Sequence, residues 1–445
     1  MSNNKNEENI EEDKNPFYKK WWFWLIVIFV LFSIIGSLPE DSEIEIDLNE
    51  ERVKYVSVRE LAEVDGELAY VAGRRGKWLV VHKDEEGGSY DVVMALTNTN
   101  GKLSYVAKAD DKWLTIKDGK EGERYDYINP NSLTNINGKI AYQVREGDKE
   151  FVVYDGKEGE RYDYINPDYL TDINGKLAYK AEEEGKEFVV YNGKEGKRYD
   201  SVGVWLIDIN GKLAYKAKEE GKEFVVYNGK EGKRYDEVSS LINVNGELFY
   251  IAREIPRGWV KVLEGEEKEQ KYEWIHSPIS INGRLAYVVV EGRDILGGDR
   301  FVVYDGKEGD RYDSVRSLIN VNGKLSYIAS EEGEEFIVFD GETGERYEKI
   351  TWLTNINGKI AYQVREGDKE FVVYDGKEGK RYDEVSWLTN VNGELAYWAK
   401  EDGLFVVYEG KESKRYDELG WMTVIEGKLA FVGRRGFRWY IVRQK

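Results

Sequence analysis

The stretch NINGKIAYQVREGDKEFVVYDGKEGKRYDEV, residues 355–385, decides the fold of this chain because its pattern recurs about every 36 residues. A fixed period of roughly 20 to 50 residues indicates a repeat architecture, in which each copy is one small structural unit. The copies run from Tyr55 to the C-terminus at Lys445. Their number and kind therefore predict the architecture better than the length of 445 residues does.

An Asn-Gly pair, or a close equivalent, is the most regular mark of the repeat. The glycines of these pairs are Gly66, Gly101, Gly138, Gly175, Gly211, Gly246, Gly283, Gly323, Gly358, Gly393 and Gly427. Their spacing of 34 to 40 residues defines eleven units. Asn-Gly between two apolar runs predicts a tight hairpin, because a type I′ turn needs positive φ at both central residues.

Each unit has room for four short strands separated by turns. In the quoted unit we expect WLTNI (352–356), KIAYQV (359–364), FVVY (371–374) and RYDEV (381–385). Four strands within one unit are typical of a β-propeller blade. The unbroken apolar run of the third strand predicts burial on both faces, which neighbouring blades provide. The more polar fourth strand is expected at the outer edge.

The two ends of the repeat predict a closed ring. Residues 54–58 match the fourth strand of a unit, yet no first three strands precede them, and the last unit stops after its third strand, at 439–442. We expect the N-terminal segment to supply the outer strand of the last blade and so close an all-β propeller of about eleven blades. Two rings of five and six blades are the alternative, although no linker interrupts the period.

A strongly apolar segment precedes the repeats. Residues 21–38 contain no charged residue and would form about 27 Å of helix, close to the thickness of a membrane. We expect an uncleaved transmembrane helix rather than a signal peptide, because an A-x-A-like cleavage site is missing. Lys19 and Lys20 before the span and acidic residues after it predict a cytoplasmic N-terminus and extracytoplasmic repeats.

The expected organisation has four parts. A disordered cytoplasmic tail covers residues 1–20, the transmembrane helix 21–38, an acidic linker 39–52 and the extracytoplasmic propeller 53–445. The expected location is therefore the cell membrane, with the protein anchored by a single span. The linker would reach the ring at the face where the outer strand begins.

Composition excludes several classes of function. With 65 basic and 85 acidic residues, the net charge of -20 argues against nucleic-acid binding. The absence of cysteine excludes disulfides and thiol-ligated metals. His82 and His276 lie in different units, so neither a histidine triad nor a zinc site is expected. The DGKEG segments lack calcium-loop and phosphate-loop patterns and predict hairpin turns. We expect no cofactor, no metal and no catalytic constellation.

The repeat also resembles known propeller families. The skeleton L-T-x-I-N-G-K-L-A-Y, followed by an apolar strand and by Y-D-x-V, is similar to TolB-type and WD-repeat-like blades and, more distantly, to bacterial WG repeats. In this chain Asn-Gly replaces the Pro-Asp-Gly turn of the TolB type, and the first strand is one residue shorter. The resemblance covers Tyr55 to Lys445 and implies a propeller fold, but it transfers no catalytic residue.

One position varies between units in a way that indicates binding. It lies two residues before the Thr or Ile of the first strand, at the junction between blades, and holds Ser in several units. Since several units carry Ser at this position, a large aromatic side chain there is not required for folding. The aromatic candidates at this position are Tyr169, Trp205, Trp352, Trp387 and Trp421.

Two pairs of arginines complete the candidate site. Arg74 and Arg75 in the first blade, and Arg434 and Arg435 in the last, occupy the loops between second and third strands. By the layout of the resembled families, these loops emerge on the same face as the aromatic residues, directed away from the membrane. Aromatic rings supply stacking area and arginines engage carboxylate or phosphate groups. The alternative is that the tryptophans fill blade junctions and the arginines pair with local glutamates.

The expected function is a membrane-anchored scaffold that binds or assembles a protein, a glycan or another anionic polymer of the cell envelope. Two alternatives stay open because propellers serve many functions. One is an enzyme acting on envelope polymers, of glycoside hydrolase or lyase type. The other is a passive structural protein of the cell surface.

Overall fold

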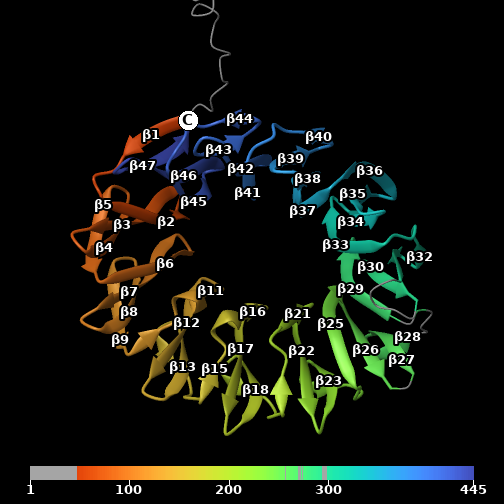
Figure 1. Ribbon diagram of the computed structural model, residues 1–445. Helices are drawn as coiled ribbons and strands as arrows, with labels where there is room; N and C mark the ends of the chain where they lie inside the picture. The colour runs from red at the N-terminus through yellow and green to blue at the C-terminus, as the bar shows by residue number, and fades with distance from the viewer. Residues whose placement is uncertain (1–47, 256, 269–271, 273, 293–297) are drawn as a thin grey trace, which may run out of the picture. The chain divides into compact units, whose positions relative to one another are not determined.

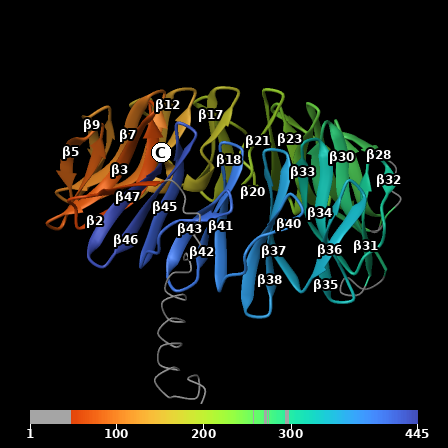
Figure 2. The same cartoon turned by 90° about the horizontal axis from the view of Figure 1, so that it is seen from above.

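The computed structural model describes residues 48–445, apart from 256, 269–271, 273 and 293–297. This part of the chain forms eleven antiparallel sheets that stand around one ring (Figure 1). The strands of each sheet run between the two faces of the ring (Figure 2). The expected all-β propeller of eleven blades is confirmed, as one ring rather than two.

The expected cytoplasmic tail and transmembrane helix, residues 1–38, lie outside the described residues, as does most of the linker. Within the described part of the chain, no helix combines the length and the apolar character needed to cross a lipid bilayer.

The innermost strand of each blade borders the central opening. Eight of these strands are continuous: β2 (Ser57–Val64), β6 (Val92–Thr99), β25 (Glu237–Val244), β29 (Trp274–Ile281), β33 (Ser314–Val321), β37 (Lys349–Ile356), β41 (Glu384–Val391) and β45 (Glu418–Ile425). Three are split: β10 (Tyr127–Ile128) with β11 (Thr134–Ile136), β15 (Tyr164–Ile165) with β16 (Thr171–Ile173), and β20 (Ser201–Val202) with β21 (Ile207–Ile209).

The second and third strands form the middle of each blade. The second strands are β3 (Glu67–Arg74), β7 (Lys102–Ala109), β12 (Lys139–Glu146), β17 (Lys176–Glu183), β22 (Lys212–Glu219), β26 (Glu247–Glu254), β30 (Arg284–Glu291), β34 (Lys324–Glu331), β38 (Lys359–Glu366), β42 (Glu394–Lys400) and β46 (Lys428–Arg435). The third strands are β4 (Lys77–His82), β8 (Lys112–Lys117), β13 (Lys149–Tyr154), β18 (Lys186–Tyr191), β23 (Lys222–Tyr227), β27 (Gly258–Leu263), β31 (Asp299–Tyr304), β35 (Glu334–Phe339), β39 (Lys369–Tyr374), β43 (Leu404–Tyr408) and β47 (Arg438–Gln444).

The outer strands are short. They are β5 (Glu85–Tyr90), β9 (Lys120–Tyr125), β14 (Lys157–Glu158), β19 (Lys194–Glu195), β24 (Lys230–Glu231), β28 (Glu266–Lys268), β32 (Lys307–Glu308), β36 (Glu342–Tyr347), β40 (Lys377–Glu378), β44 (Lys411–Glu412) and, for the last blade, β1 (Leu48–Arg52). Short polar outer strands leave little free edge for pairing with another chain.

Tight turns join the strands as the Asn-Gly pattern predicts. Between β41 and β42, Asn392 has φ 51° and Gly393 φ 93°. Between β39 and β40, Asp375 has φ 52° and Gly376 φ 73°. Positive φ at both central residues is the requirement of a type I′ turn, so the DGKEG segment is a hairpin turn as expected. We call the side of the ring that carries these turns the Asn-Gly face and the opposite side the linking face.

The apolar core lies between the blades, because each third strand is buried on both faces. Phe371 and Val373 pack with Tyr347 of the preceding blade. Val372, which points the other way, packs with Tyr397 of the following blade. The continuous apolar run in the sequence is therefore explained by contact with two neighbours, as predicted.

Two recurring hydrogen bonds also join neighbouring blades. Near the inner side, the backbone N–H of Val385 donates to the Glu370 carboxylate at 2.9 Å. Near the outer side, the Tyr382 hydroxyl donates to Glu412 of the next blade at 3.0 Å. Burial, followed by the nearby Tyr397 and Glu412, raises the pKa of Tyr382 well above its usual range. This phenol therefore stays protonated and keeps its role as a donor.

The ring closes where the N-terminal outer strand completes the last blade. β1 pairs antiparallel with β47, and Glu50 then occupies the place that Glu412 has in the preceding blade. It accepts hydrogen bonds from Tyr416 at 2.5 Å and from Lys414 at 3.2 Å. The seam thus repeats the contact found between other blades, and closure by an N-terminal outer strand is confirmed.

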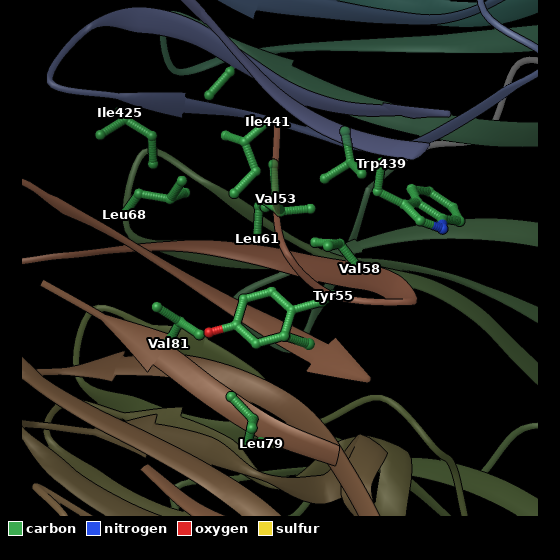
Figure 3. Packing of buried hydrophobic residues seen from close by; sticks show 13 residues of the cluster. Val53, Tyr55, Val58, Leu61, Leu68, Leu79, Val81, Ile425, Trp439 and Ile441 are labelled. Atoms are coloured by element: carbon green, nitrogen blue, oxygen red, sulfur yellow. The ribbon is translucent and has the colours of Figure 1, made fainter. Parts of the chain in front are cut away.

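The apolar side of this seam is equally continuous. Figure 3 shows Val58 and Leu61 of the first blade beside Ile425, Trp439 and Ile441 of the last blade, all in one buried cluster. The first and last blades are therefore neighbours, as the closure argument requires.

The strand boundaries differ from the expectation. The closing strand lies at Leu48–Arg52, inside the expected linker of 39–52, whereas residues 54–58 lead into the inner strand β2. The reason is that the Tyr-Asp-x-Val pattern spans two blades. Tyr382 bridges to Glu370 of its own blade, but Val385 already belongs to β41 of the next. The propeller therefore includes residues 48–52, which were expected to form linker, and in the quoted unit the Lys-Glu pair, not RYDEV, forms the outer strand.

Candidate functional site

The five aromatic candidates lie on the wall of the central opening. Trp352, Trp387 and Trp421 occupy the middle of the innermost strands β37, β41 and β45, in three consecutive blades (Figure 1). Tyr169 and Trp205 lie where the innermost strands of two earlier blades are interrupted. The expectation of a face built from inter-blade loops is therefore corrected to the inner wall of the ring.

A β-bulge sets the direction of the Trp387 side chain. In β41 the register shifts between Ser386 and Thr389, so that Trp387 and Leu388 together face a single residue of β42. A bulge leaves its extra residue unpaired and turns the local backbone. Because neighbouring blades cover both faces of an inner strand, the exposed side chain of Trp387 must face the opening.

The bulge belongs to the fold and not to tryptophan. Ser240, Ser277 and Ser317 occupy the same position in other blades with φ of 57°, 51° and 55°. Trp387 adopts the same left-handed backbone, with φ 59°. A non-glycine residue in this conformation costs roughly 1–2 kcal/mol, and such strain collects at binding sites. A large indole where serine suffices therefore indicates a role other than folding.

The indole rings are open to solvent, and that of Trp387 is supported from behind. The exposed fraction is 55% for Trp352, 53% for Trp387 and 50% for Trp421. Trp387 stacks on Trp398 of β42, with ring centroids 5.3 Å apart and an interplanar angle of 16°. Sequence reasoning missed Trp398, although a tryptophan where other units have Val, Ile, Gln or Lys was a visible signal. Rigid, half-exposed rings offer contact area at low entropic cost.

Tyr169 and Trp205 form a second aromatic group. Tyr169 ends the short 3-10 helix η3 (Pro167–Tyr169), and Trp205 lies between β20 and β21. Their ring centroids are 5.2 Å apart in an edge-to-face arrangement with an interplanar angle of 74°. The structure thus brings together two residues from adjacent blades, with Trp205 the more exposed partner at 67%.

Sequence reasoning also missed the interruption of three innermost strands. The 3-10 helix η2 (Pro130–Ser132) separates β10 from β11, just as η3 separates β15 from β16. In each case an asparagine side chain before the proline accepts a hydrogen bond from the backbone two residues later. Proline cannot donate to a strand ladder, so the Asn-Pro pairs of these units were the available signal.

The wall at the tryptophan position carries little charge. Glu60 is the one charged residue among the eleven at that position. It accepts a hydrogen bond from the backbone N–H of Leu96 at 3.2 Å, and burial raises the pKa of its carboxyl. Arg316 on the neighbouring position of β33 pairs with Glu335 at 2.7 Å. At this one position of the wall, rings and hydroxyls with a single carboxylate therefore contrast with the net charge of -20.

The four arginine candidates lie elsewhere, in the second strands and turns of the first and last blades. Arg74 pairs with Glu86 at 2.8 Å and Arg434 with Glu418 at 2.9 Å. Arg435 pairs with Glu50 of the closing strand at 2.5 Å.

Arg75 is exposed at the turn between β3 and β4 and forms no ion pair with any described residue. Three of the four charges are thus occupied by glutamates, and the structure does not place them on the aromatic wall.

The two histidines have ordinary surroundings. His82 Nε2 lies 3.4 Å from the carbonyl oxygen of Val64. His276 Nδ1 lies 2.9 Å from the Ser277 hydroxyl, and burial together with Arg300 lowers the pKa of His276. No group of His, Asp or Glu suited to hold a metal ion occurs among the residues that the structure describes.

Comparison with known proteins does not assign the chain to a family. No protein family model and no curated protein matches the chain. Among solved structures, the β-propeller domain of the trilobed protease from Pyrococcus furiosus is similar at 16% identity over 54% of this chain and 93% of that chain, with a TM-score of 0.31.

Two further structures are similar at the same level. A eukaryotic initiation factor matches at 9% identity over 83% of this chain and 90% of that chain, with a TM-score of 0.38. PorZ, a surface component of the type-IX secretion system of Porphyromonas gingivalis, matches at 10% identity over 87% of this chain and 72% of that chain, with a TM-score of 0.21. Values this low carry no argument about activity or ligand.

Proposed function

We propose that the chain is a binding scaffold that takes up an extended partner along the inner wall of its ring. The observation that carries this proposal is the row of half-exposed tryptophans, Trp352, Trp387 and Trp421, in three consecutive blades. Trp387 occupies a bulge with the same left-handed backbone that Ser240, Ser277 and Ser317 adopt in other blades. Trp352 and Trp421 occupy the same position of the repeat, so the fold does not require an aromatic residue there. Repeated rings on one wall suit a partner that is itself long and repetitive.

The partner class follows from the charge of the wall. Nucleic acid is disfavoured because its binding draws on clustered, unpaired Lys and Arg side chains. The neutral rings and hydroxyls favour a polysaccharide or a protein segment of the cell envelope over a strongly anionic polymer. The ion pairs of Arg74, Arg434 and Arg435 point in the same direction, because a ligand anion would have to displace their glutamates.

We also propose that residues 21–38 anchor the protein in the membrane, with a cytoplasmic N-terminus and the ring outside. The support is the uncharged length of that segment and the lysines before it. The full-length protein is expected to stay in the membrane pellet after alkaline carbonate extraction, and protease added from outside is expected to reach the ring. Release of the intact chain by carbonate would contradict the anchor. The TolB-type or WD-repeat-like character of the blades is part of the same proposal.

The binding proposal is tested by replacing the three tryptophans with serine, the residue that other blades carry. The unaltered protein and the triple variant are immobilised and used to capture cell-wall polysaccharides and envelope proteins. We expect the triple variant to lose most of the captured material while keeping its circular dichroism spectrum.

A matched control replaces exposed apolar residues away from the opening, Phe437 at the turn between β46 and β47 and Val56 between β1 and β2. Phe437→Ser with Val56→Ser is expected to leave capture unchanged. Equal capture by the triple tryptophan variant and the unaltered protein would overturn the proposal.

A further inference from the structure

A cleft of about 680 Å³ opens on the inner wall between the fifth and sixth blades. One side is formed by the segment 203–207, which includes Trp205, and the other by residues 237–241 of β25. Its size falls within the range of roughly 300–1,000 Å³ that is usual for small-molecule sites. The repeat pattern does not predict this cleft, because the pattern assigns the same four strands to every blade.

The cleft exists because the innermost strand of the fifth blade is broken without being refilled. In the third and fourth blades the break is filled by the 3-10 helices η2 and η3. In the fifth blade Gly203 stands in the gap instead, and a Cβ atom added there would lie 3.2 Å from the Cβ of Lys216. The missing side chain therefore lets the backbone approach β22 closely and leaves the space in front of Trp205 open.

The cleft presents polar groups that are free to bind a ligand. The hydroxyls of Ser239 and Ser240 lie 3.1 Å apart at its edge, where one proton is shared and further donor and acceptor positions remain. Among the described residues, the backbone N–H groups of Val204 and Trp205 find no hydrogen-bond partner. These neutral donors and acceptors line the same cleft as the exposed indole of Trp205, together with Ile207, Val238 and Leu241.

The two charged residues of the cleft are already engaged. Lys216 pairs with Glu223 at 3.3 Å, and Glu237 pairs with Arg253 at 3.2 Å. An anionic ligand would therefore gain little from Lys216 without breaking an existing ion pair. The free groups are hydroxyls, amides and an aromatic ring, and this set matches a neutral sugar, which has an apolar C–H face and an edge of hydroxyls.

We propose that this cleft binds the sugar rings of a neutral glycan, with one ring stacked on Trp205 and its hydroxyls bonded to Ser239 and Ser240. The inference rests on the proposed function and deepens it, because it assigns the chemical class of the partner and gives it a second point of attachment. Tyr169, held edge-on against Trp205, fixes the orientation of the indole.

The test uses short neutral glycans that fit the cleft: cellotriose, chitotriose, maltotriose and mannotriose, titrated into the full-length protein in detergent and followed by calorimetry and by saturation-transfer NMR. We expect at least one of them to bind, and Trp205→Ser to weaken that binding by about tenfold or more, through loss of the stacking surface. Phe437→Ser, which removes an exposed ring on the linking face and away from the opening, is the matched control and is expected to leave trisaccharide affinity unchanged.

A second matched pair tests the hydroxyls without changing any large side chain. Ser239→Ala is expected to weaken binding about threefold to tenfold, because a bond from a sugar hydroxyl is lost. Ser386→Ala, at the same position in β41, is expected to have no effect. Thermal unfolding of all four variants shows whether the ring is intact.

The outcomes separate this inference from the proposed function. The proposal of a glycan site in the cleft is overturned if no trisaccharide binds at millimolar concentration. It is also overturned if Trp205→Ser and the unaltered protein bind trisaccharides with equal affinity. If the triple variant of Trp352, Trp387 and Trp421 still loses capture of envelope polymers, the scaffold stands and only the cleft falls. If trisaccharides bind at Trp205 but the triple variant captures as much polymer as the unaltered protein, the glycan site in the cleft is supported and the proposal of binding along the wall is refuted.

Discussion

Replacing Glu50 tests whether the chain closes its ring in the way that the structure shows. The Glu50 carboxylate belongs to β1 and accepts hydrogen bonds from Tyr416 and Lys414 and an ion pair from Arg435. Burial alone would raise its pKa, but these partners outweigh burial and hold the pKa of Glu50 below its ordinary value. Glu50→Ala therefore removes an ionised group that holds three side chains of the seam.

The magnitude follows from the exposure of the groups involved. The Glu50 side chain is 14% exposed, whereas Lys414 is 51% and Arg435 34% exposed. A hydrogen bond to a charged group contributes roughly 1.5–3 kcal/mol, and pairs with exposed partners contribute about 0–1 kcal/mol. We expect Glu50→Ala to lower the free energy of unfolding by about 3 kcal/mol.

Two matched variants make the prediction sharp when measured by urea unfolding. Glu412→Ala removes the equivalent glutamate of an internal seam and is expected to cost the same within about 1 kcal/mol. Glu51→Ala alters the next residue of β1, whose one ion pair among the described residues is a 4.0 Å contact with Arg443, and is expected to cost less than about 0.5 kcal/mol. A cost for Glu50→Ala no larger than that for Glu51→Ala would refute closure by β1.

Three further predictions concern acid, turns and strain. Acidification is expected to destabilise the ring from about pH 4.5 down to about pH 2. Hydrogen bonds from lysines are the main cause that lowers the pKa of Glu86 and of Glu267 to about 2 in the folded chain, so the unfolded chain binds protons at a higher pH than the folded chain does. An equal urea midpoint at pH 7 and pH 3 would contradict this. Gly393→Ala is expected to lower the melting temperature more than Gly376→Ala does. A Cβ atom at residue 393 would lie 2.7 Å from the Asn357 side chain of the preceding blade, whereas a Cβ atom at residue 376 meets nothing within 4 Å. Equal losses would argue against that contact. Trp387→Gly is expected to change the free energy of unfolding by less than about 1 kcal/mol. Glycine relieves the backbone strain at φ 59°, and this gain offsets the loss of the stack on Trp398. A loss above about 2 kcal/mol would show that Trp387 is part of the core.

Most of the fold is predictable from local sequence because the same turn and strand signals recur in eleven units. Asn-Gly pairs determine the hairpins through their tolerance of positive φ, and the apolar run at Phe371 requires cover on both faces. The missing strands at the two ends determine closure. The exact closing strand was not predictable from the repeat, because Leu48–Arg52 does not share the Lys-Glu pair that most other outer strands carry and is recognisable only by its pairing with β47.

The candidate site was predictable in composition but not in place. Substitution between units identified Trp387 and its equivalents, but the sequence does not show a bulge, so their direction into the opening required the structure. The cleft beside Trp205 depends on a strand that is broken and left unfilled, an outcome of packing between two blades. The arginines looked available because the glutamates that pair with them, such as Glu50 and Glu86, are distant in sequence.

Oxidative footprinting of the tryptophans, with and without a cell-wall polysaccharide extract, tests most directly whether the partner lies along the inner wall. Hydroxyl radicals modify exposed indole rings, and mass spectrometry reports the protection of each one separately. We predict that the extract protects Trp352, Trp387 and Trp421 while leaving Phe437, fully exposed on the linking face, as reactive as before. Protection of Phe437 with unchanged reactivity of the three tryptophans would contradict a binding site inside the ring.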